Sequence, residues 1–571
     1  TPGRSSALPG RCVGVRRNGE STPHASTRPS VHPHSQNRSP ARVLDTIRRR
    51  WYVTIPVAVV VGGVLIPLVY LLLRAFQADP GTLWDLVVRG RTLRLLWNTV
   101  GLTAGVLAGT SALALPLAWL TTRTALPGRK ALTLLGVLPL AVPGYVMAYA
   151  LMATTGEYGT LAQTLGLVVP RLSGYTGAWL ALSLSTFPYL FLNLRTAFLG
   201  LDPSLEESAQ ALGRGRWRVF VQVVLPQLRP AFLSGGLLVA LHVLGDFGVV
   251  SLMRYDTFSY ALYIQYAASY DRIYAACLAL MLLILTGAIL LLEARLLKGL
   301  LFHRTESGTS RTAARYELGR GRWAGYAFAL GVAGLSVVLP AGTVGYWMTD
   351  AAAGGVPWAG LGAALWDSVS ASAPAAVLAA LLALPVAYLG VRHPSPWTRV
   401  VERAAYLGYA TPPLAFALAL IVFSLGVVPF AYQTLALLVT AYALHFMAEA
   451  VGPVRSALYQ APPHLEEAAR SLGRSPLGAF VSVTFPLVRR GLLVSMAFVF
   501  LSAMKELPLT FLLAPIGFET LALNTWSYAE EAMFGQAAPY ALTIMFVSAL
   551  FVGVLLLREQ ASERPAAAER T

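Results

Sequence analysis

Long runs of apolar residues recur along the chain, separated by shorter segments that carry most of the charges. The first such run covers residues 52–73. A run of about 18 or more apolar residues can cross the roughly 30 Å hydrocarbon core of a bilayer as a helix. The pattern predicts twelve such helices, near residues 52–76, 96–121, 131–153, 176–200, 229–253, 273–298, 324–348, 366–391, 401–426, 429–455, 489–514 and 536–557. The sequence therefore predicts an all-α integral membrane protein.

The composition agrees with this prediction. Hydrophobic residues make up 56% of the chain and charged residues 12%, whereas an average soluble domain is about one quarter charged. The net charge of +17 does not indicate a nucleic-acid partner, because residues 1–50 carry ten arginines against Glu20 and Asp45. Most other arginines lie in short loops beside the predicted spans, where membrane topology places them. We expect membrane lipid, and no nucleic acid, around this chain.

The predicted spans fall into two halves of six. We expect a disordered basic tail at residues 1–45, a first repeat at 46–298, a cytoplasmic linker at 299–323, a second repeat at 324–558 and a cytoplasmic tail at 559–571. No signal peptide is apparent, and the arginines at 48–50 favour a cytoplasmic N-terminus. An even number of spans then places both termini in the cytoplasm. The arginine-rich loop at 89–94 would lie outside, against the positive-inside rule.

The two halves are copies of one another. Residues 114–118 match residues 383–387 at an offset of 269. Further along, residues 201–226 match residues 461–486 at an offset of 260, which a deletion of nine residues in the intervening outer loop explains. Because each copy holds six spans, both have the same orientation. The sequence thus predicts two parallel six-helix repeats, related by an axis along the membrane normal.

One motif occurs in both repeats, in the predicted cytoplasmic loop between the fourth and fifth spans. The first copy consists of Glu207, Ser208 and Ala209, followed by Gly213 and Pro226. The second copy consists of Glu467, Ala468 and Ala469, followed by Gly473 and Pro486. The spacing inside the two copies is identical. An ordinary amphipathic helix at the membrane surface would not predict the second copy.

The motif residues also predict a local structure. Asp202 can cap a helix whose first position is Pro203, and Pro463 repeats that start. The acidic pairs Glu206 and Glu207, and Glu466 and Glu467, would lie in the first turn, where the helix dipole favours anions. Gly213 and Gly473 suit a left-handed turn at the end of this helix. We expect a second short helix that ends at Pro226 or Pro486.

These two segments resemble the EAA loop of the permease subunits of ATP-binding-cassette (ABC) importers. We refer to residues 201–226 and 461–486 as the first and second EAA loops. The resemblance implies the type I permease fold and implies that each loop sits in a groove of a separate ATPase subunit, of which two copies are expected. It also implies a binding protein outside the membrane that delivers the substrate.

The chain itself is not expected to be an enzyme. A phosphate-binding loop for ATP needs a Gly-Lys pair, and the sequence contains none. No cluster of histidine and cysteine suggests a metal site, and no pair of nucleophile and base suggests catalysis. We therefore expect no cofactor on this chain, with ATP and magnesium bound by the partner ATPase.

Two acidic stretches bear on the substrate. Gly245-Asp246-Phe247-Gly248 in the fifth span and Lys505-Glu506-Leu507-Pro508 in the eleventh span resemble those of ferric-iron permeases, with thiamine permeases similar. Sulfate, polyamine and phosphonate remain alternatives within this class of permease. A secondary transporter driven by an ion gradient is the alternative from another class, but it would not need EAA loops.

Asp246 and Glu506 are equivalent across the repeat, since their numbers differ by 260. Charges inside membrane spans are costly and usually functional. With Lys505 beside them, they form a candidate substrate pathway for a cation near the outer face. The structural interpretation is that Lys505 pairs with a carboxylate and that both acids brace helix ends. The sequence leaves both interpretations open.

Overall fold

The computed structural model describes residues 51–77, 88–268, 272–298, 315–355 and 357–563, together with Gly81 and Trp84. The predicted tail at residues 1–45, most of the predicted linker at 299–323 and most of the predicted tail at 559–571 lie outside these ranges. From Tyr52 onward, the described residues form one compact unit. In the described residues the secondary structure is helical, apart from one isolated bridge between Thr124 and Tyr316. The all-α prediction is confirmed.

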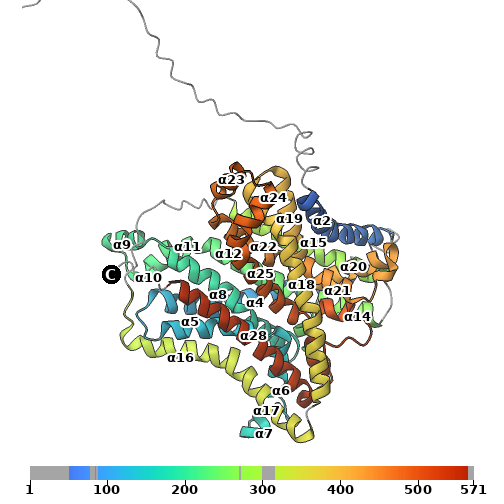
Figure 1. Ribbon diagram of the computed structural model, residues 1–571. Helices are drawn as coiled ribbons and strands as arrows, with labels where there is room; N and C mark the ends of the chain where they lie inside the picture. The colour runs from blue at the N-terminus through green and yellow to red at the C-terminus, as the bar shows by residue number, and fades with distance from the viewer. Residues whose placement is uncertain are drawn as a thin grey trace, which may run out of the picture. The chain divides into compact units, whose positions relative to one another are not determined.

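Figure 1 shows the helices of the first half. They are α2 (Trp51–Ala75), α4 (Gly90–Arg123), α5 (Arg129–Val137), η1 (Leu138–Ala141), α6 (Gly144–Thr154), α7 (Thr160–Leu165), α8 (Gly174–Gly200), α9 (Pro203–Ala211), α10 (Arg216–Val219), η2 (Phe220–Val224), α11 (Leu225–Gln227), α12 (Arg229–Gly245), α13 (Gly248–Leu252), α14 (Phe258–Ala268) and α15 (Arg272–Leu297). The first EAA loop contains α9, α10, η2 and most of α11.

The second half repeats this order. Its helices are η3 (Gly319–Gly321), α16 (Arg322–Ala333), η4 (Gly334–Val338), α17 (Leu339–Gly354), α18 (Trp358–Arg392), α19 (Pro396–Ala410), α20 (Pro413–Val427), η5 (Pro429–Ala431), α21 (Leu435–His445), α22 (Met447–Gln460), α23 (Pro463–Ser471), α24 (Pro476–Ala479), η6 (Phe480–Thr484), α25 (Phe485–Met504), α26 (Pro508–Leu513), α27 (Leu521–Glu530) and α28 (Phe534–Glu563). The second EAA loop contains α23, α24 and η6.

The number of spans agrees with the prediction only when bent helices are counted as single spans. Among the described residues, eight helical stretches are long and apolar enough to cross a membrane. Four further pairs of helices qualify together, each bent by more than 40° at a short break, which brings the number to as many as twelve. Each predicted span has a counterpart in this set.

The third predicted span of each repeat is not a straight helix, so this part of the prediction is wrong. The helices on either side of Val142 and Pro143 are bent by 93°, and those on either side of Thr411 and Pro412 by 106°. A proline disfavours helical dihedral angles at the residue before it, and Val142 and Thr411 have ψ angles of 109° and 127°. The predicted span at 429–455 is likewise broken, by 53°, between α21 and α22.

The fifth span of each repeat ends earlier than predicted. Helix α12 ends at Gly245 and α25 at Met504, whereas the sequence pattern predicted helices to residues 253 and 514. The short helices α13 and α26 follow after turns that contain Asp246 and Glu506. These carboxylates therefore lie at helix breaks and not inside continuous helices.

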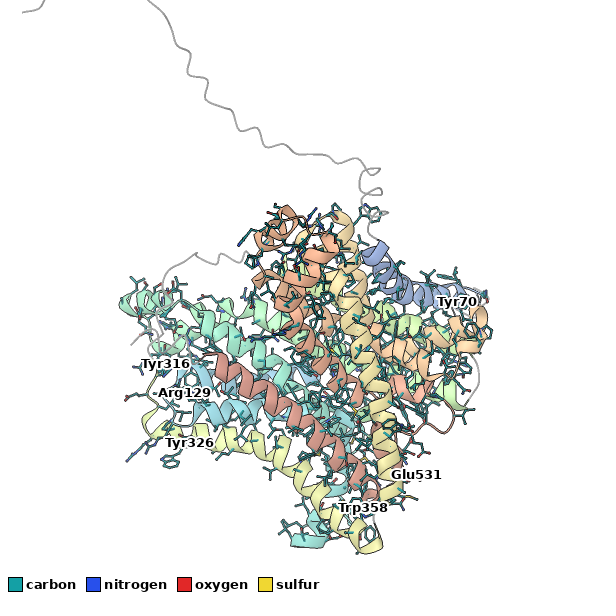
Figure 2. All side chains as sticks on the ribbon, viewed as in Figure 1. Tyr70, Arg129, Tyr316, Tyr326, Trp358 and Glu531 are labelled. Atoms are coloured by element: carbon teal, nitrogen blue, oxygen red, sulfur yellow. The ribbon has the colours of Figure 1, made fainter. Side chains whose placement is uncertain are left out.

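Close packing of small residues holds the spans together. Helix α18 packs against α22 and α25 and buries a stripe of alanines: Ala371, Ala375, Ala379 and Ala383. Small residues let helix backbones approach closely in a membrane. Side chains fill the spaces between the helices (Figure 2). Polar contacts join the repeats: Tyr149 Oη donates to the carbonyl of Phe534 at 2.9 Å, and Trp526 Nε1 donates to Ser251 Oγ at 2.9 Å.

Candidate functional site

The first helix of each EAA loop begins as the sequence predicted. The side chain of Asp202 accepts a hydrogen bond from the backbone N–H of Ser204 at 2.9 Å, with Pro203 at the first helical position. This hydrogen bond holds the pKa of Asp202 below its ordinary value. Helix α23 also begins at a proline, Pro463, but its N-cap residue is Pro462, which offers no capping side chain.

The two glycines adopt the predicted left-handed conformation. Gly213 has a φ of 79° and Gly473 a φ of 85°. The following amides close the turn, since Arg214 N–H donates to the carbonyl of Ala209 at 3.2 Å and Arg474 N–H does the same to Ala469 at 3.1 Å. A Cβ atom on either glycine would meet nothing within 4 Å. The backbone angle alone therefore requires glycine here.

The second helix of each loop does not end at its proline, contrary to the prediction. In the second repeat, residues 476–504 are continuously helical and pass through Pro486. In the first repeat the helix runs past Pro226 to Gln227 before a bend of 61°. In each copy a π-helical turn directly precedes this region, η2 in the first and η6 in the second. Its wider hydrogen-bonding pattern gives the proline ring room that a regular α-helix lacks.

The structure distinguishes the two adjacent glutamates of each loop. Glu207 and Glu467 are exposed, whereas Glu206 and Glu466 are buried. The anchors of the buried glutamates differ. Arg123 Nη2 lies 2.7 Å from Glu206 Oε1, and Tyr316 Oη donates to Glu206 Oε2 at 3.1 Å.

Glu466 in the second loop is held by hydroxyl groups. Tyr388 Oη donates to its Oε1 at 2.8 Å, and Thr484 Oγ1 donates to its Oε2 at 3.0 Å. The sequence interpretation missed these anchors. Arg123 and Arg392 are equivalent at the repeat offset of 269. An arginine at the same position in both repeats, at the end of a span, was the signal that could have identified Arg123 as an anchor.

Both EAA loops present large apolar side chains on their surface. Leu212 is 83% exposed and Leu472 is 86% exposed. The other exposed members of this set are Leu205, Trp217, Val221, Leu465, Leu477, Val481 and Phe485. Clusters of exposed apolar residues beside charged ones indicate a surface that binds another protein. The equivalent positions of Leu212 and Leu472 give the two loops matching tips.

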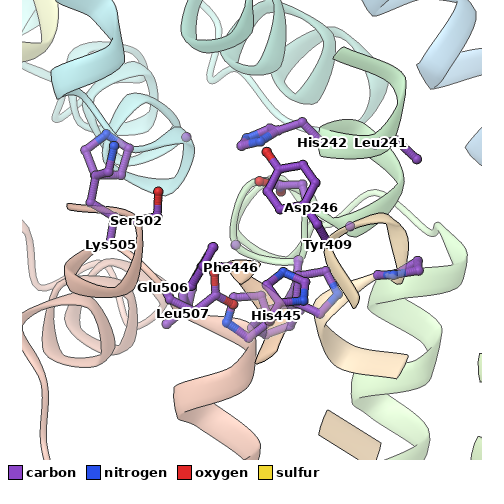
Figure 3. A pocket seen from close by; sticks show the side chains of 18 of the residues that line it. Leu241, His242, Asp246, Tyr409, His445, Phe446, Ser502, Lys505, Glu506 and Leu507 are labelled. Carbon is purple, nitrogen blue, oxygen red and sulfur yellow. The ribbon is translucent and has the colours of Figure 1, made fainter. Parts of the chain in front are cut away.

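A cavity of about 170 Å³ lies where the broken helices of both repeats meet. Its walls are the turn between η1 and α6, the ends of α12 and α25, and the turns that follow α19 and α21 (Figure 3). The acidic and basic side chains lining it are Asp246, Glu449, Lys505, Glu506, His242 and His445. The structure therefore brings together the three predicted pathway residues and adds Glu449, which the sequence interpretation missed.

The two equivalent carboxylates perform the same backbone task. Asp246 Oδ1 accepts from the N–H of Val249 at 2.8 Å, and Glu506 Oε1 accepts from the N–H of Leu509 at 3.2 Å. Each thus caps the short helix that follows it, α13 or α26. This geometry agrees with the expectation that both acids brace helix ends. Both residues also line the cavity.

Lys505 does not make the ion pair that the structural interpretation expected. Its Nζ donates to the backbone carbonyl of Leu140 at 3.1 Å, and no carboxylate lies within the 4.0 Å limit for an ion pair in the described part of the chain. Its counterpart in the first repeat is Gly245, where a Cβ would approach Pro413 Cδ to 2.8 Å. Close contact with Pro413 therefore leaves no room for a side chain at position 245, whereas position 505 accommodates a lysine.

Glu449, Ser502 and His445, which also line the cavity, come from the second repeat's fourth and fifth spans. Glu449 accepts a hydrogen bond from Ser502 Oγ at 2.7 Å. His445 packs among the rings of Tyr409, Phe416 and Phe446. Within the described residues, no three histidine, cysteine or acidic side chains gather closely enough to hold a metal ion.

Comparison with known proteins gives matches along most of the chain. The profile of the family described as "binding-protein-dependent transport system inner membrane component" matches twice, at residues 101–300 and 374–561. The ferric-iron transport system permease protein FbpB 2 of Haemophilus influenzae is 29% identical over 518 residues, which cover 90% of this chain and 99% of that protein.

Two shorter relatives match part of the chain. The molybdenum transport system permease protein ModB of Escherichia coli is 35% identical over 23% of this chain and 58% of its own length. The sulfate transport system permease protein CysT of Escherichia coli is 30% identical over 33% of this chain and 68% of its own length. These proteins share the permease function in their names but differ in the solute.

Proposed function

The chain belongs to the family of binding-protein-dependent transport system inner membrane components, and from this premise we propose that it is the fused permease of an ABC importer for ferric iron. The family places it in the inner membrane as a multi-pass permease subunit. The observation that carries the choice of iron is the match to the ferric-iron permease, which covers both repeats and 90% of the chain.

The cavity favours a cation over an oxyanion. Its lining holds three carboxylic acids, Asp246, Glu449 and Glu506, against one lysine, Lys505. A cleft lined by an excess of one sign of charge concentrates ions of the opposite sign. Sulfate and molybdate, the solutes suggested by the shorter relatives, would be repelled. Thiamine or another cationic solute remains the second candidate, because the same excess charge would attract it.

Within the described residues, the acids of the cavity do not gather into a metal site, and such an arrangement suits a pathway. An ion in transit must bind well enough to enter but weakly enough to leave. Asp246 and Glu506 each cap a helix with one carboxylate oxygen, and this hydrogen bond fixes the side chain in place. The two carboxylates thus line the cavity from opposite repeats. We infer that they attract the ion electrostatically and do not chelate it.

The EAA loops supply the link to ATP hydrolysis. We infer that each binds one ATPase subunit through its exposed apolar tip, Leu212 or Leu472, and its exposed acid, Glu207 or Glu467. One chain carrying two such loops would bind two ATPase copies. This arrangement requires both loops and both chain termini to face the cytoplasm, with the binding protein on the opposite side.

The test replaces Asp246 with asparagine and Glu506 with glutamine in one chain. The amide oxygens can still cap α13 and α26, so the fold should be kept while the charge is removed. Focusing of ions in a charged cleft raises their local concentration by roughly tenfold or more. We therefore expect uptake of labelled ferric iron into vesicles containing the complete importer to fall about tenfold, with the melting temperature unchanged.

Glu519 is the matched control, because it is an exposed acid outside the cavity. Glu519→Gln should leave uptake unchanged. Unchanged uptake in the double variant would refute the cation pathway, and a lowered melting temperature would show that the acids are mainly structural. Uptake of sulfate or molybdate by the unaltered importer would refute iron. Uptake that an ionophore abolishes, without any need for ATP, would refute the ABC importer itself.

A further inference from the structure

Glu206 and Glu466, the buried glutamates of the two EAA loops, are equivalent, but the tyrosines that donate hydrogen bonds to them come from different parts of the chain. In the second repeat, Tyr388 of α18 donates to Glu466. At the repeat offset of 269, the position equivalent to Tyr388 is Trp119 of α4. In the first repeat, Tyr316 takes the place of this phenol and donates to Glu206. Tyr316 belongs to neither of the equivalent helices: it precedes α16, in the segment that connects the two repeats.

Tyr316 is bound to the first repeat by its backbone as well as its side chain. Its N–H donates to the carbonyl of Arg123 at 2.8 Å, and its carbonyl accepts from the N–H of Ala125 at 3.0 Å. Its ring stacks on Trp119 with 6.4 Å between ring centroids and 27° between the planes. The guanidinium of Arg216 in α10 lies 5.7 Å from the ring centroid. The ring therefore lies against α4 and against α10 inside the first EAA loop.

The hydroxyl group of Tyr316 is suited to act as a donor to Glu206. Burial and the negative charge of Glu206 raise the pKa of Tyr316 above its ordinary value. The phenol thus stays protonated at neutral pH and can donate its hydrogen bond to the carboxylate. Gln210 of α9 donates from Nε2 to the same hydroxyl at 3.5 Å.

We propose that Tyr316 is a positioning residue for transport, because its hydroxyl fixes the first EAA loop to the start of the second repeat. It supplies to Glu206 the hydroxyl group that Tyr388 supplies to Glu466 from within the second repeat. The proposal rests on the proposed role of the EAA loops in binding the ATPase. Tyr316 acts through Glu206 and touches neither substrate nor ATP.

The segment after Tyr316 gives this contact a mechanical consequence. Tyr326 of α16 donates from its hydroxyl to the carbonyl of Pro127 at 2.8 Å, and a Cβ on Gly325 would lie 3.1 Å from Leu120 Cδ2. Helix α16 therefore packs against the end of α4 and the loop after it. Figure 2 labels Tyr316 and Tyr326 along one edge of the ribbon. A displacement of α9 by the ATPase is passed directly to the first helix of the second repeat.

The experiment uses the complete importer in vesicles and three variants of this chain. Tyr316→Phe removes only the hydroxyl of the first loop, and Tyr388→Phe removes only that of the second. The third variant combines Tyr316→Phe with Trp119→Tyr, which places a phenol at the position equivalent to Tyr388. Each is tested for solute transported per ATP hydrolysed and for amide hydrogen exchange in α9 and α23.

A hydrogen bond to a charged group is worth roughly tenfold in an equilibrium. We expect Tyr316→Phe to speed exchange in α9 about tenfold without changing α23, and to lower the solute transported per ATP. Tyr388→Phe should reverse the pattern. The combined variant should recover both α9 protection and the transport ratio, which a general loss of packing at residue 316 would not allow.

Unchanged exchange and transport in Tyr316→Phe would overturn the proposal, and so would a loss that Trp119→Tyr does not recover. Trp119→Tyr alone serves as the control and should transport normally. These results are separate from failure of the proposed function, in which the unaltered chain would neither bind an ATPase nor require ATP for uptake.

Discussion

Replacing Arg123 with methionine should loosen the first EAA loop far more than the matching change at Arg392 loosens the second. Arg123 and Glu206 form an ion pair at 2.7 Å whose side chains are only 6% and 9% exposed. Removing one partner of a buried ion pair leaves an uncompensated charge and typically costs about 3–5 kcal/mol. Tyr316 would still hold one carboxylate oxygen, so we expect the lower end of this range.

Arg392 provides a matched control because it makes a different contact. Its Nη2 donates to the backbone carbonyl of Ala461 at 2.7 Å, while Glu466 keeps both of its hydroxyl partners. Loss of one such hydrogen bond costs about 1 kcal/mol. A difference of about 2 kcal/mol between the two variants corresponds to a factor of roughly 30 in the equilibrium for local opening.

Amide hydrogen exchange on peptides from α9 and α23 measures this opening directly. In Arg123→Met, exchange in α9 should rise by roughly 100-fold, and α23 should not change. Adding Glu206→Gln should restore most of the protection, because no buried charge then lacks a partner. Equal effects of the two arginine variants, or no recovery in the double variant, would refute the reasoning.

Two other predictions concern the EAA loops. Gly213→Val and Gly473→Val should each lower transport per ATP at normal expression, because a β-branched residue costs about 1–2 kcal/mol or more at positive φ. Gly215→Val is the control, since Gly215 has a φ of −63°. Equal effects of the substitutions at 213 and 215 would contradict this prediction. The intact importer should contain one copy of this chain and two ATPase subunits, so a native mass that shows two copies of the chain would rule this out.

Local features of the sequence determined the class of protein. Apolar runs long enough to span a bilayer predicted the helices, and the repeated EAA motif predicted two equivalent loops, because length, hydropathy and spacing require no knowledge of tertiary contacts. Asp202 and Gly213 were interpreted correctly for the same reason. A cap and a left-handed turn depend on a few neighbouring residues and on the backbone angle of one.

The tertiary structure determined which of these residues are buried, which are exposed and which contact one another. Glu206 and Glu207 are adjacent and chemically identical, and only the packing of α9 against α4 and Tyr316 buries one and exposes the other. The apolar pattern predicted that the fifth spans continue through Asp246 and Glu506. It could not show that each carboxylate accepts a hydrogen bond from the start of a new helix. The cavity arises from breaks in several helices of both repeats, and Tyr316 reaches Glu206 across 110 positions of sequence. Such contacts exist only once distant segments have packed together.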